Sequence, residues 1–583
     1  MKKKKKRKHK YKIKRKIKIL VLLLIIIIPL SYYILKNEDK ITVKEVSKFL
    51  ASSTNEIQSY IKDEDGNLQE KEKFIRGTEI KTKNKVEQIN NIDYEKVYIN
   101  KNTYYIKEEN LVTDKSKIVQ EEKIYDRTPT YILEDLETAK ISGLVKKEDE
   151  LQVLGYNKIQ EDGEVDYYYI QINDIKGYVK SNYTTRTKEE ASKNYEAETY
   201  DQIHSKVADT FNGGKAINLD FYPEEKPKFQ NNVMPDSVYA LYLNNGANVI
   251  KNIDDYIELA KDTKINAFVL DIKDNETPGY PANTFKELSP TNYERAINSY
   301  DDYKNAVTKL KEAGFYVIGR ITTFKDNFYI QDHKEDAITN KQTNEPYLHT
   351  GSYWPSPYSR NVWYYTVSLA KEAVKEFGFN EINFDYVRFP DRMQSVENNV
   401  DLLNTYNEDK SQAIQRFVQY ATDELHKLNT YVSIDVFGES TNGTYMTAYG
   451  QYWPAISNVA DVICGMPYPD HFSNGYYGIN KPWNNPYKLL NTWARYAKER
   501  QDETPSPAGA RTWIQAYDVM KYVDPSGISY NAEEVEQEIR ALYEGGLDGG
   551  YITWLSNSNL EKYKAQKKAY QIDYLKEYQQ WKK

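Results

Sequence analysis

The sequence contains a single cysteine in 583 residues, and this scarcity excludes several kinds of site. Cys464 has no partner for an intramolecular disulfide and cannot build a cysteine-cluster metal site. The six histidines are scattered along the chain without an HExxH or HxH pair, which argues against a zinc enzyme. We therefore predict that the protein uses neither a metal ion nor another cofactor.

The start of the chain lacks acidic residues and alanine. Residues 1–18 hold 13 lysines and arginines and no acid, and the uncharged run ILVLLLIIIIPLSYYIL follows at 19–35. Seventeen such residues are just long enough to span a bilayer, and the basic side stays in the cytoplasm. A cleaved signal peptide would need a small-x-small site, but no alanine precedes Ala51. We predict a cytoplasmic tail at 1–18, an uncleaved single-pass transmembrane helix at 19–35, and extracellular C-terminal domains at the cell membrane.

A short stalk at 36–58 leads into two segments with β-strand patterns, at 59–114 and 121–185. Each contains a strand, a polar turn and a second strand that ends in Tyr-Ile-Lys (Tyr105–Lys107) or Tyr-Val-Lys (Tyr178–Lys180). Both segments resemble the last hairpin of a bacterial SH3-like domain. The resemblance implies binding to cell-wall peptidoglycan or to a neighbouring domain, and small barrels that serve only as spacers are the alternative.

After a proline- and asparagine-bearing linker at 186–236, the pattern changes to alternating strands and helices. The runs with strand character are Val238–Leu243, Ala267–Ile272, Tyr316–Ile321, Ile382–Arg388, Val432–Phe437, Val462–Met466, Thr512–Ala516 and Gly550–Leu555. Helical patterns lie between them, for example Tyr303–Ala313, Val362–Phe377, Gln412–Leu428 and Ala532–Tyr543. This count of strands and connections predicts an α/β fold, a (β/α)8 TIM-type barrel at 237–562, with a C-terminal helix at 563–583.

Polar side chains recur on one face of these strands. The residues opposite the apolar positions are Asp271, Lys273, Arg320, Asn383, Asp385, Ser433, Asp435, Trp513 and Gln515, and Asp274 follows in a loop. In a barrel they would point inward and converge at the C-terminal mouth. Strands ~4.8 Å apart would place Asp385 and Asp435 within ~5–6 Å, near the carboxylate spacing of retaining glycosidases. Structural ion pairs at the mouth are the alternative.

Aromatic placement also points to a carbohydrate. All eight tryptophans follow Ser237, and several, including Trp354 and Trp554, are predicted at loops or strand ends. Flat indole faces complement the CH surface of a sugar ring, although core packing is the alternative for each one. The chain beyond the basic tail is strongly acidic, which argues against nucleic acid as a partner.

Several segments resemble motifs of a family of bacterial glycosyl hydrolase domains, often of cell-surface proteins. They are Val269–Asp274, Arg320–Asp326, Gly378–Pro390, Val432–Gly438, Met466–Phe472 and Arg511–Gln515, and the resemblance spans Ala240–Ser558. It implies a TIM-type barrel with a glycosidase-like site and leaves the catalytic pair open. The family usually has an aromatic residue at Glu439, which makes Glu439 a poor general acid. It also usually has Ser at Asp470 and Pro at Thr512.

We therefore predict a membrane-anchored extracellular glycoside hydrolase that acts on a cell-wall or surface polysaccharide, such as peptidoglycan. Asp385 is the expected nucleophile or base, Asp435 its leading partner and Asp271 the third candidate. The residues expected to bind substrate are Lys273, Asp274, Arg320, Arg388, Tyr468, His471, Trp513, Gln515 and Trp554. A non-catalytic surface protein that binds wall polysaccharide is the alternative, and nothing in the sequence indicates an oligomeric state.

Overall fold

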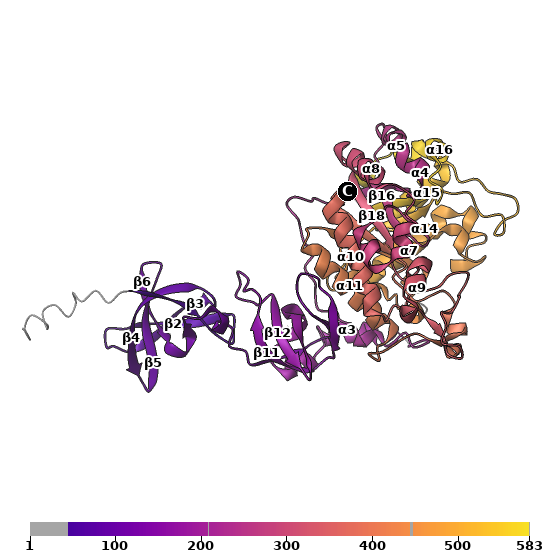
Figure 1. The fold of residues 1–583 in the computed structure, drawn as a ribbon. Coiled ribbons are helices and arrows are strands. Elements are labelled where there is room, and N and C mark those ends of the chain that lie inside the picture. Colours follow the sequence, from indigo (N-terminus) through magenta and orange to yellow (C-terminus); the bar gives the residue numbers. More distant parts are fainter. Residues whose placement is uncertain (1–44, 208, 443–446, 582–583) are drawn as a thin grey trace, which may run out of the picture. The chain divides into compact units, whose positions relative to one another are not determined.

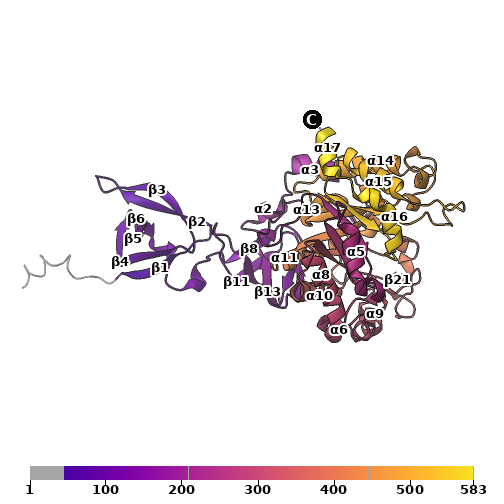
Figure 2. The same ribbon diagram turned by 90° about the horizontal axis from the view of Figure 1, so that it is seen from above.

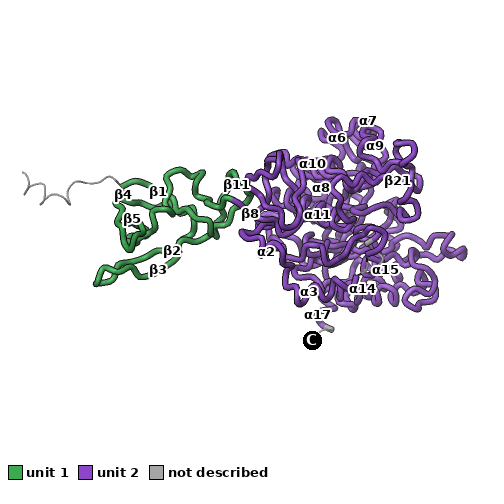
Figure 3. Tube along the Cα trace, turned by 90° about the horizontal axis from the view of Figure 1, so that it is seen from below, with its two compact units in different colours: residues 1–122, 153–168 green, residues 123–152, 169–583 purple. Residues whose placement is uncertain are grey.

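The computed structural model describes residues 45–207, 209–442 and 447–581 (Figure 1). The chain forms two compact units, which Figure 3 distinguishes by colour. One unit contains the residues up to 122 together with 153–168, and the other contains 123–152 together with the chain from 169 onward.

The first unit is built on an antiparallel seven-stranded sheet of order β3-β2-β6-β5-β4-β1-β7. Its strands are β1 (Val46–Leu50), β2 (Glu56–Lys62), β3 (Leu68–Ile75), β4 (Glu79–Ile89), β5 (Ile92–Ile99), β6 (Asn102–Lys107) and β7 (Leu111–Val112). Leu50, Ile57, Val97 and Ile106 belong to its core. This all-β architecture fits the SH3-like resemblance. The sheet begins at Val46, inside the segment that we assigned to the stalk.

A second seven-stranded sheet has the order β10-β9-β13-β12-β11-β8-β14. Its strands are β8 (Lys123–Asp126), β9 (Thr130–Leu133), β10 (Ile141–Val145), β11 (Glu150–Tyr156), β12 (Tyr167–Ile172), β13 (Ile175–Lys180) and β14 (Thr184–Thr185). Neighbours such as β9 and β10 run antiparallel. Alternation of buried and exposed residues along β11 and β13 leaves one face of the sheet for the core, as expected for a small β-domain.

The segment after this sheet is held against the barrel along much of its length. It contains the helices α2 (Lys188–Ser192) and α3 (Ala197–His204). Its Leu219 and Phe221 share a hydrophobic cluster with Tyr452 of the barrel. Lys226 donates hydrogen bonds to the carbonyls of residues 457, 458 and 460, and so caps the C-terminus of α13 (Trp453–Val459).

The barrel consists of parallel strands in the order β24-β23-β22-β20-β18-β16-β15-β26-β25. Their bounds are β15 (Val238–Leu243), β16 (Ala267–Asp274), β18 (Tyr316–Thr322), β20 (Glu381–Asp385), β22 (Tyr431–Phe437), β23 (Val462–Met466), β24 (Gly509–Ala510), β25 (Thr512–Gln515) and β26 (Gly550–Trp554). Arg511 alone separates β24 from β25, so these two form one interrupted strand between β23 and β26. The ring is therefore nearly closed, as a TIM-type barrel requires.

Amphipathic helices surround the strands (Figures 1 and 2). They include α5 (Ile253–Ala260), α8 (Tyr300–Glu312), α10 (Arg360–Phe377), α11 (Lys410–His426), α14 (Pro486–Asp502) and α15 (Ala532–Glu544). Each predicted strand and helix of the barrel has its counterpart here. The C-terminal helix is divided into α16 (Leu560–Tyr570) and α17 (Tyr574–Trp581).

The predicted membrane anchor requires correction. The tail at 1–18 and the span at 19–35 lie outside the described residues. A bilayer span needs about 20 predominantly apolar residues. Within the described ranges no helix is long and apolar enough to cross a membrane; the 18-residue α10, for example, carries several charges. This finding contradicts the single-pass anchor and the membrane location derived from it. The fold is a TIM-type barrel preceded by all-β structure.

Candidate active site

A cleft of about 760 Å³ opens where the barrel strands end, and we call it the mouth cleft. Its lining combines acidic, basic and aromatic side chains. The residues are Asp274, Arg320, Thr350, Asp385, Tyr386, Arg388, Asp391, Arg392, Phe437, Glu439, Tyr449, Met466, Tyr468, Asp470, His471, Phe472, Trp513, Tyr522 and Trp554. Most follow the C-terminal ends of strands, where barrel enzymes build their active sites.

The inward positions of the strands are apolar at the beginning and charged at the end. Val269 and Ile318 belong to the barrel core, and two residues further on the same strand faces carry Asp271 and Arg320. A residue alternates sides along a strand, so two steps return to the same face. The core therefore fills the bottom of the barrel and leaves the polar residues for the mouth.

Arg320 is the centre of the charge network beneath the mouth cleft. Its Nη1 lies 2.6 Å from Asp271 Oδ1 and 3.4 Å from Asp274 Oδ1, and its Nη2 lies 2.5 Å from Asp385 Oδ2. The Tyr242 hydroxyl donates a further hydrogen bond to Asp271. Burial raises the pKa of Asp271 to about 6, although Arg320 opposes the shift. Burial acts the same way on Asp274, but Arg320 and the Thr322 hydroxyl outweigh it and lower the pKa of Asp274.

Asp385 is the last residue of β20 and faces the mouth cleft. Its side chain is 10% exposed, and its Oδ1 accepts a hydrogen bond of 2.6 Å from the backbone N–H of Tyr386. Tyr386 has φ of 54°, in the left-handed region that non-glycine residues seldom adopt. The chain therefore turns away directly after the carboxylate and leaves it at the end of the strand. Such strained residues cluster at functional sites.

Asp435 lies on the neighbouring strand β22 and is fully buried. Its Oδ1 accepts hydrogen bonds of 2.8 Å from Asn383 Nδ2 and from Trp513 Nε1. Its Oδ2 has no hydrogen-bond partner among the described residues. Burial, and then the charge of Asp385, raise the pKa of Asp435 well above its ordinary value. These effects favour the protonated form of Asp435.

The predicted site residues divide into three groups. Those that line the mouth cleft are Asp274, Arg320, Asp385, Arg388, Tyr468, His471, Trp513 and Trp554. Asp271 and Asp435 lie buried next to it, in contact with residues that line it. Lys273 and Gln515 do not line it. Gln515 instead accepts a hydrogen bond of 3.2 Å from the backbone of Asp470 and so supports the loop at the rim.

Lys273 was predicted to bind substrate, but it lies outside the mouth cleft. The pairing of β16 with β18 shifts register between Asp271 and Lys273, so simple alternation no longer holds there. The Lys273 ammonium is fully buried and forms an ion pair of 2.8 Å with Asp326. Asn292 donates a further hydrogen bond to Asp326, so this is a second polar cluster next to the barrel.

Glu439 lines the mouth cleft, although the resemblance made it a poor candidate. It follows Gly438 at the end of β22, and burial raises the pKa of its carboxyl group. Its side chain forms no ion pair or hydrogen bond with another residue of the described ranges. The sequence signal that could have identified Glu439 is its position directly after a barrel strand, because such residues face the mouth.

A possible metal cluster lies outside the mouth cleft. In the described ranges, His333, Glu335 and Asp336 bring ligand atoms within 4.8 Å of one another. Both ring nitrogens of His333 already face partners, Glu335 at 3.1 Å and the Leu288 carbonyl at 2.8 Å. This cluster is better described as a hydrogen-bonded cap of a surface turn.

Comparison with known proteins identifies the family. A family model described as "Putative glycosyl hydrolase domain" matches residues 240–560, which is more than half of the chain. The chain belongs to this family. The barrel is therefore that of a glycoside hydrolase, and its substrate is a carbohydrate. No protein among the curated sequences matches.

Solved structures similar to this chain include the PgaB (BpsB) glycoside hydrolase domain from Bordetella bronchiseptica. That domain is 12% identical, with a TM-score of 0.42, and the match covers 58% of this chain and 99% of the other. A class V chitinase from Pseudomonas fluorescens is 13% identical, with a TM-score of 0.36 and coverages of 57% and 99%. A hypothetical protein from Ruminiclostridium thermocellum is 28% identical over 35% of this chain and 99% of its own, with a TM-score of 0.29.

Proposed function

We propose that the barrel hydrolyses a cell-wall or surface polysaccharide in the mouth cleft, with Asp385 as the reacting carboxylate. The observation that carries this proposal is the position of Asp385 at the floor of the cleft, with its Oδ2 2.5 Å from the Arg320 guanidinium. The guanidinium orients the carboxylate, which either attacks the anomeric carbon or takes a proton from the attacking water.

Glycoside hydrolysis also needs an acid that protonates the leaving oxygen as the C–O bond breaks. Burial raises the pKa of Asp435, but this residue is fully buried and does not line the cleft. Of the carboxyl groups that do, Asp274 and Asp391 are held by arginines and Asp470 by the Tyr517 hydroxyl. Glu439 combines access to the cleft with a pKa raised by burial, so we assign it the role of proton donor. We assign Asp435 to positioning, through Asn383 and Trp513.

Substrate contacts come from the aromatic and polar wall of the cleft. Trp513 and Trp554 lie with their ring centroids 5.7 Å apart, and Tyr468 and His471 follow β23. Indole and phenol rings bind the apolar faces of sugars, and the imidazole and hydroxyl groups can bind sugar hydroxyls. The SH3-like region would bring such a domain to wall polysaccharide.

The test is release of reducing ends by the purified chain. The substrates are intact peptidoglycan, its peptide-free glycan strands, wall teichoic acid and exopolysaccharide, each with wild type and Asp385→Asn. We expect release from at least one polymer by wild type and none by the variant. Binding without release by either protein would contradict hydrolysis and favour a polysaccharide-binding barrel.

A further inference from the structure

Arg388 and Arg392 line the mouth cleft, Lys325 lies beside the ring of Tyr386, which also lines it, and we call these three cations the basic corner. We propose that the basic corner binds the anionic substituent of an acidic glycan, either a sugar carboxylate or a phosphate. This inference rests on the proposed function, because it names the class of glycan that the same cleft accepts.

Lys325 and Arg388 lie beside the same two aromatic rings. Lys325 Nζ is 4.9 Å from the centroid of Tyr386 and 5.8 Å from that of Trp354. The Arg388 guanidinium carbon is 4.7 Å and 5.4 Å from the same two centroids, and 4.2 Å from that of Phe437. These cation–π contacts hold the guanidinium beside the rings, while its Nη1 also donates to the Phe389 carbonyl at 3.1 Å and its Nη2 to Asp391 Oδ2 at 3.4 Å.

The third cation extends this group into the open cleft. Arg392 is exposed, lines the cleft and has φ of 55°, a left-handed conformation. Arg388 also lines the cleft, as does Tyr386, the ring beside Lys325. One turn of chain after β20 thus presents two arginines next to the proposed reacting carboxylate.

Acidic residues of the protein neutralise the positive charge of the basic corner only in part. Asp391, whose side chain is 42% exposed, forms an ion pair of 3.2 Å with Arg388. Neither Lys325 nor Arg392 forms an ion pair with any residue of the described chain. Asp274, Asp391 and Asp385 act on Lys325 from further away, but Asp274 and Asp385 are held by Arg320, and Asp391 is paired with Arg388. Burial and the charge of Arg388 lower the pKa of Lys325, which agrees with an excess of positive charge.

Lys325 is a partly buried cation without an ion-pair partner in the described ranges, which is unfavourable, and functional sites are where proteins retain such groups. An anion on the substrate would neutralise this charge and accept hydrogen bonds from the Lys325 ammonium and the Arg392 guanidinium, because guanidinium groups bind carboxylates and phosphates with paired hydrogen bonds. A neutral glycan would leave the same donors unsatisfied. The basic corner is thus suited to select acidic glycans over neutral ones of the same backbone.

The test measures binding by calorimetry with the full chain carrying Asp385→Asn, so that no substrate is consumed. Anionic probes are hyaluronan and peptide-free peptidoglycan strands for carboxylates, and wall teichoic acid for phosphates. Neutral probes are dextran and chitohexaose. Lys325→Met and Arg392→Gln are added singly and together, and Lys568→Met, at an exposed lysine of α16, is the matched control.

We expect at least one anionic probe to bind about tenfold or more tightly than both neutral ones, since a charged hydrogen bond supplies that difference. The two corner substitutions should remove the preference, and Lys568→Met should retain it. The class of probe that binds shows whether the basic corner recognises a carboxylate or a phosphate. Equal binding of neutral glycans, unchanged binding by the corner variants, or no binding of any anionic probe would overturn the proposal. Reducing-end release by wild type is scored separately, so a failure of hydrolysis stays distinguishable.

Discussion

Arg320 forms ion pairs with several carboxylates at once, and this determines how much stability is lost when one carboxylate is replaced. The guanidinium contacts Asp271, Asp274 and Asp385, and its side chain is only 3% exposed. A buried ion pair that loses one member usually leaves an isolated charge, which costs about 3–5 kcal/mol. Loss of one carboxylate here leaves two others beside the guanidinium. The network can therefore hold a reacting acid without depending on it for folding.

Asp385→Asn is predicted to abolish turnover and to spare the fold. Turnover should fall at least ~10³-fold, as for loss of a nucleophile or essential base. The free energy of unfolding should change by less than about 2 kcal/mol, because Asp271 and Asp274 still neutralise Arg320. Kinetics and urea unfolding on one preparation measure both, with Asp274→Asn as the matched control at the same guanidinium. A loss of stability above about 3 kcal/mol would show that Asp385 is a structural ion-pair partner.

Glu439→Gln is predicted to change the pH profile of the reaction. A proton donor must be protonated, so wild-type kcat/KM should fall as pH rises through the raised pKa of Glu439. The variant should lose this alkaline limb together with about 10²–10⁴-fold in rate. With aryl glycosides, whose leaving group needs no proton, the rate of the variant should fall much less.

Glu503→Gln is the matched control for this prediction. Burial also raises the pKa of Glu503, but this residue does not line the mouth cleft. It should leave the profile unchanged. An alkaline limb that persists in Glu439→Gln would assign the proton donor to another group.

At the scale of the element, the interrupted seventh strand shows how the barrel closes. Arg511 separates β24 from β25, and its Nη1 lies 2.6 Å from Glu381 Oε1 at the start of β20. The Tyr316 hydroxyl donates to the other oxygen of Glu381 at 3.0 Å. Both charged side chains are at most 1% exposed. The end of the barrel opposite the mouth thus contains a buried ion pair with a hydrogen-bonded tyrosine beside it.

Arg511→Met should destabilise the barrel by about 3–5 kcal/mol, because it leaves the Glu381 carboxyl group buried without its ion-pair partner. Adding Glu381→Leu should restore part of this loss, since a packed apolar pair replaces an ion pair at little net cost. Chemical denaturation of the single and double variants measures the difference. A double variant that is no more stable than Arg511→Met would show that the pair is needed for closure itself.

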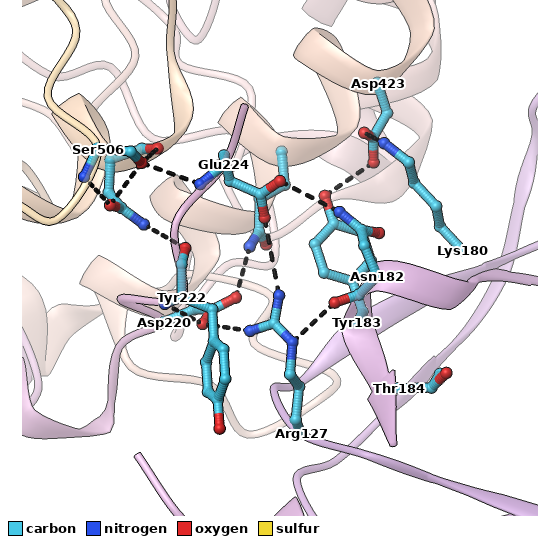
Figure 4. Close-up of polar contacts among 12 residues, drawn as sticks. Arg127, Lys180, Asn182, Tyr183, Thr184, Asp220, Tyr222, Glu224, Asp423 and Ser506 are labelled. Carbon is cyan, nitrogen blue, oxygen red and sulfur yellow. Dashed lines mark hydrogen bonds and ion pairs between the residues drawn. The ribbon is translucent and has the colours of Figure 1, made fainter. Parts of the chain in front are cut away.

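At the scale of the whole molecule, the second β-sheet and the barrel meet through buried charges (Figure 4). Arg127 Nη1 lies 2.7 Å from Asp220 Oδ1. Asp423 of α11 accepts hydrogen bonds from the hydroxyls of Tyr131 and Tyr183 and forms an ion pair with Lys180. Burial favours the protonated form, but Lys180 and the two tyrosines prevail and lower the pKa of Asp423. The segment at 186–236, which joins the second β-sheet to the barrel, is therefore packed against its neighbours.

A fragment that starts at residue 237 should consequently melt at a lower temperature than one that starts at residue 123. The shorter fragment leaves Asp423 without its three partners and removes the helix cap supplied by Lys226. Scanning calorimetry of both fragments tests this, with Asp423→Asn in the longer fragment as an intermediate case. Equal melting temperatures would show that the barrel does not depend on this interface.

Alternation and spacing were enough to predict much of the barrel. The β15 and β23 boundaries agree with the strand patterns, and the inward face of Asp271, Asp385 and Asp435 follows from period-two alternation. The register shift after Asp271 could not be read this way, because a bulge depends on how the neighbouring strand pairs. For that reason Lys273 was assigned to the mouth although it lies in a separate cluster.

The sequence by itself determined the order of strands and helices, the family and the residues available at the strand ends, because these follow from local periodicity and motif. Only the tertiary structure decided which carboxyl groups reach the cleft, since access depends on layers of side chains from different strands. Asp435 and Asp385 both lie near the C-terminal ends of neighbouring strands. Asn383 and Trp513 enclose the Asp435 carboxyl group. The turn at Tyr386 leaves the Asp385 carboxylate accessible to the cleft. Packing between distant segments settles this difference.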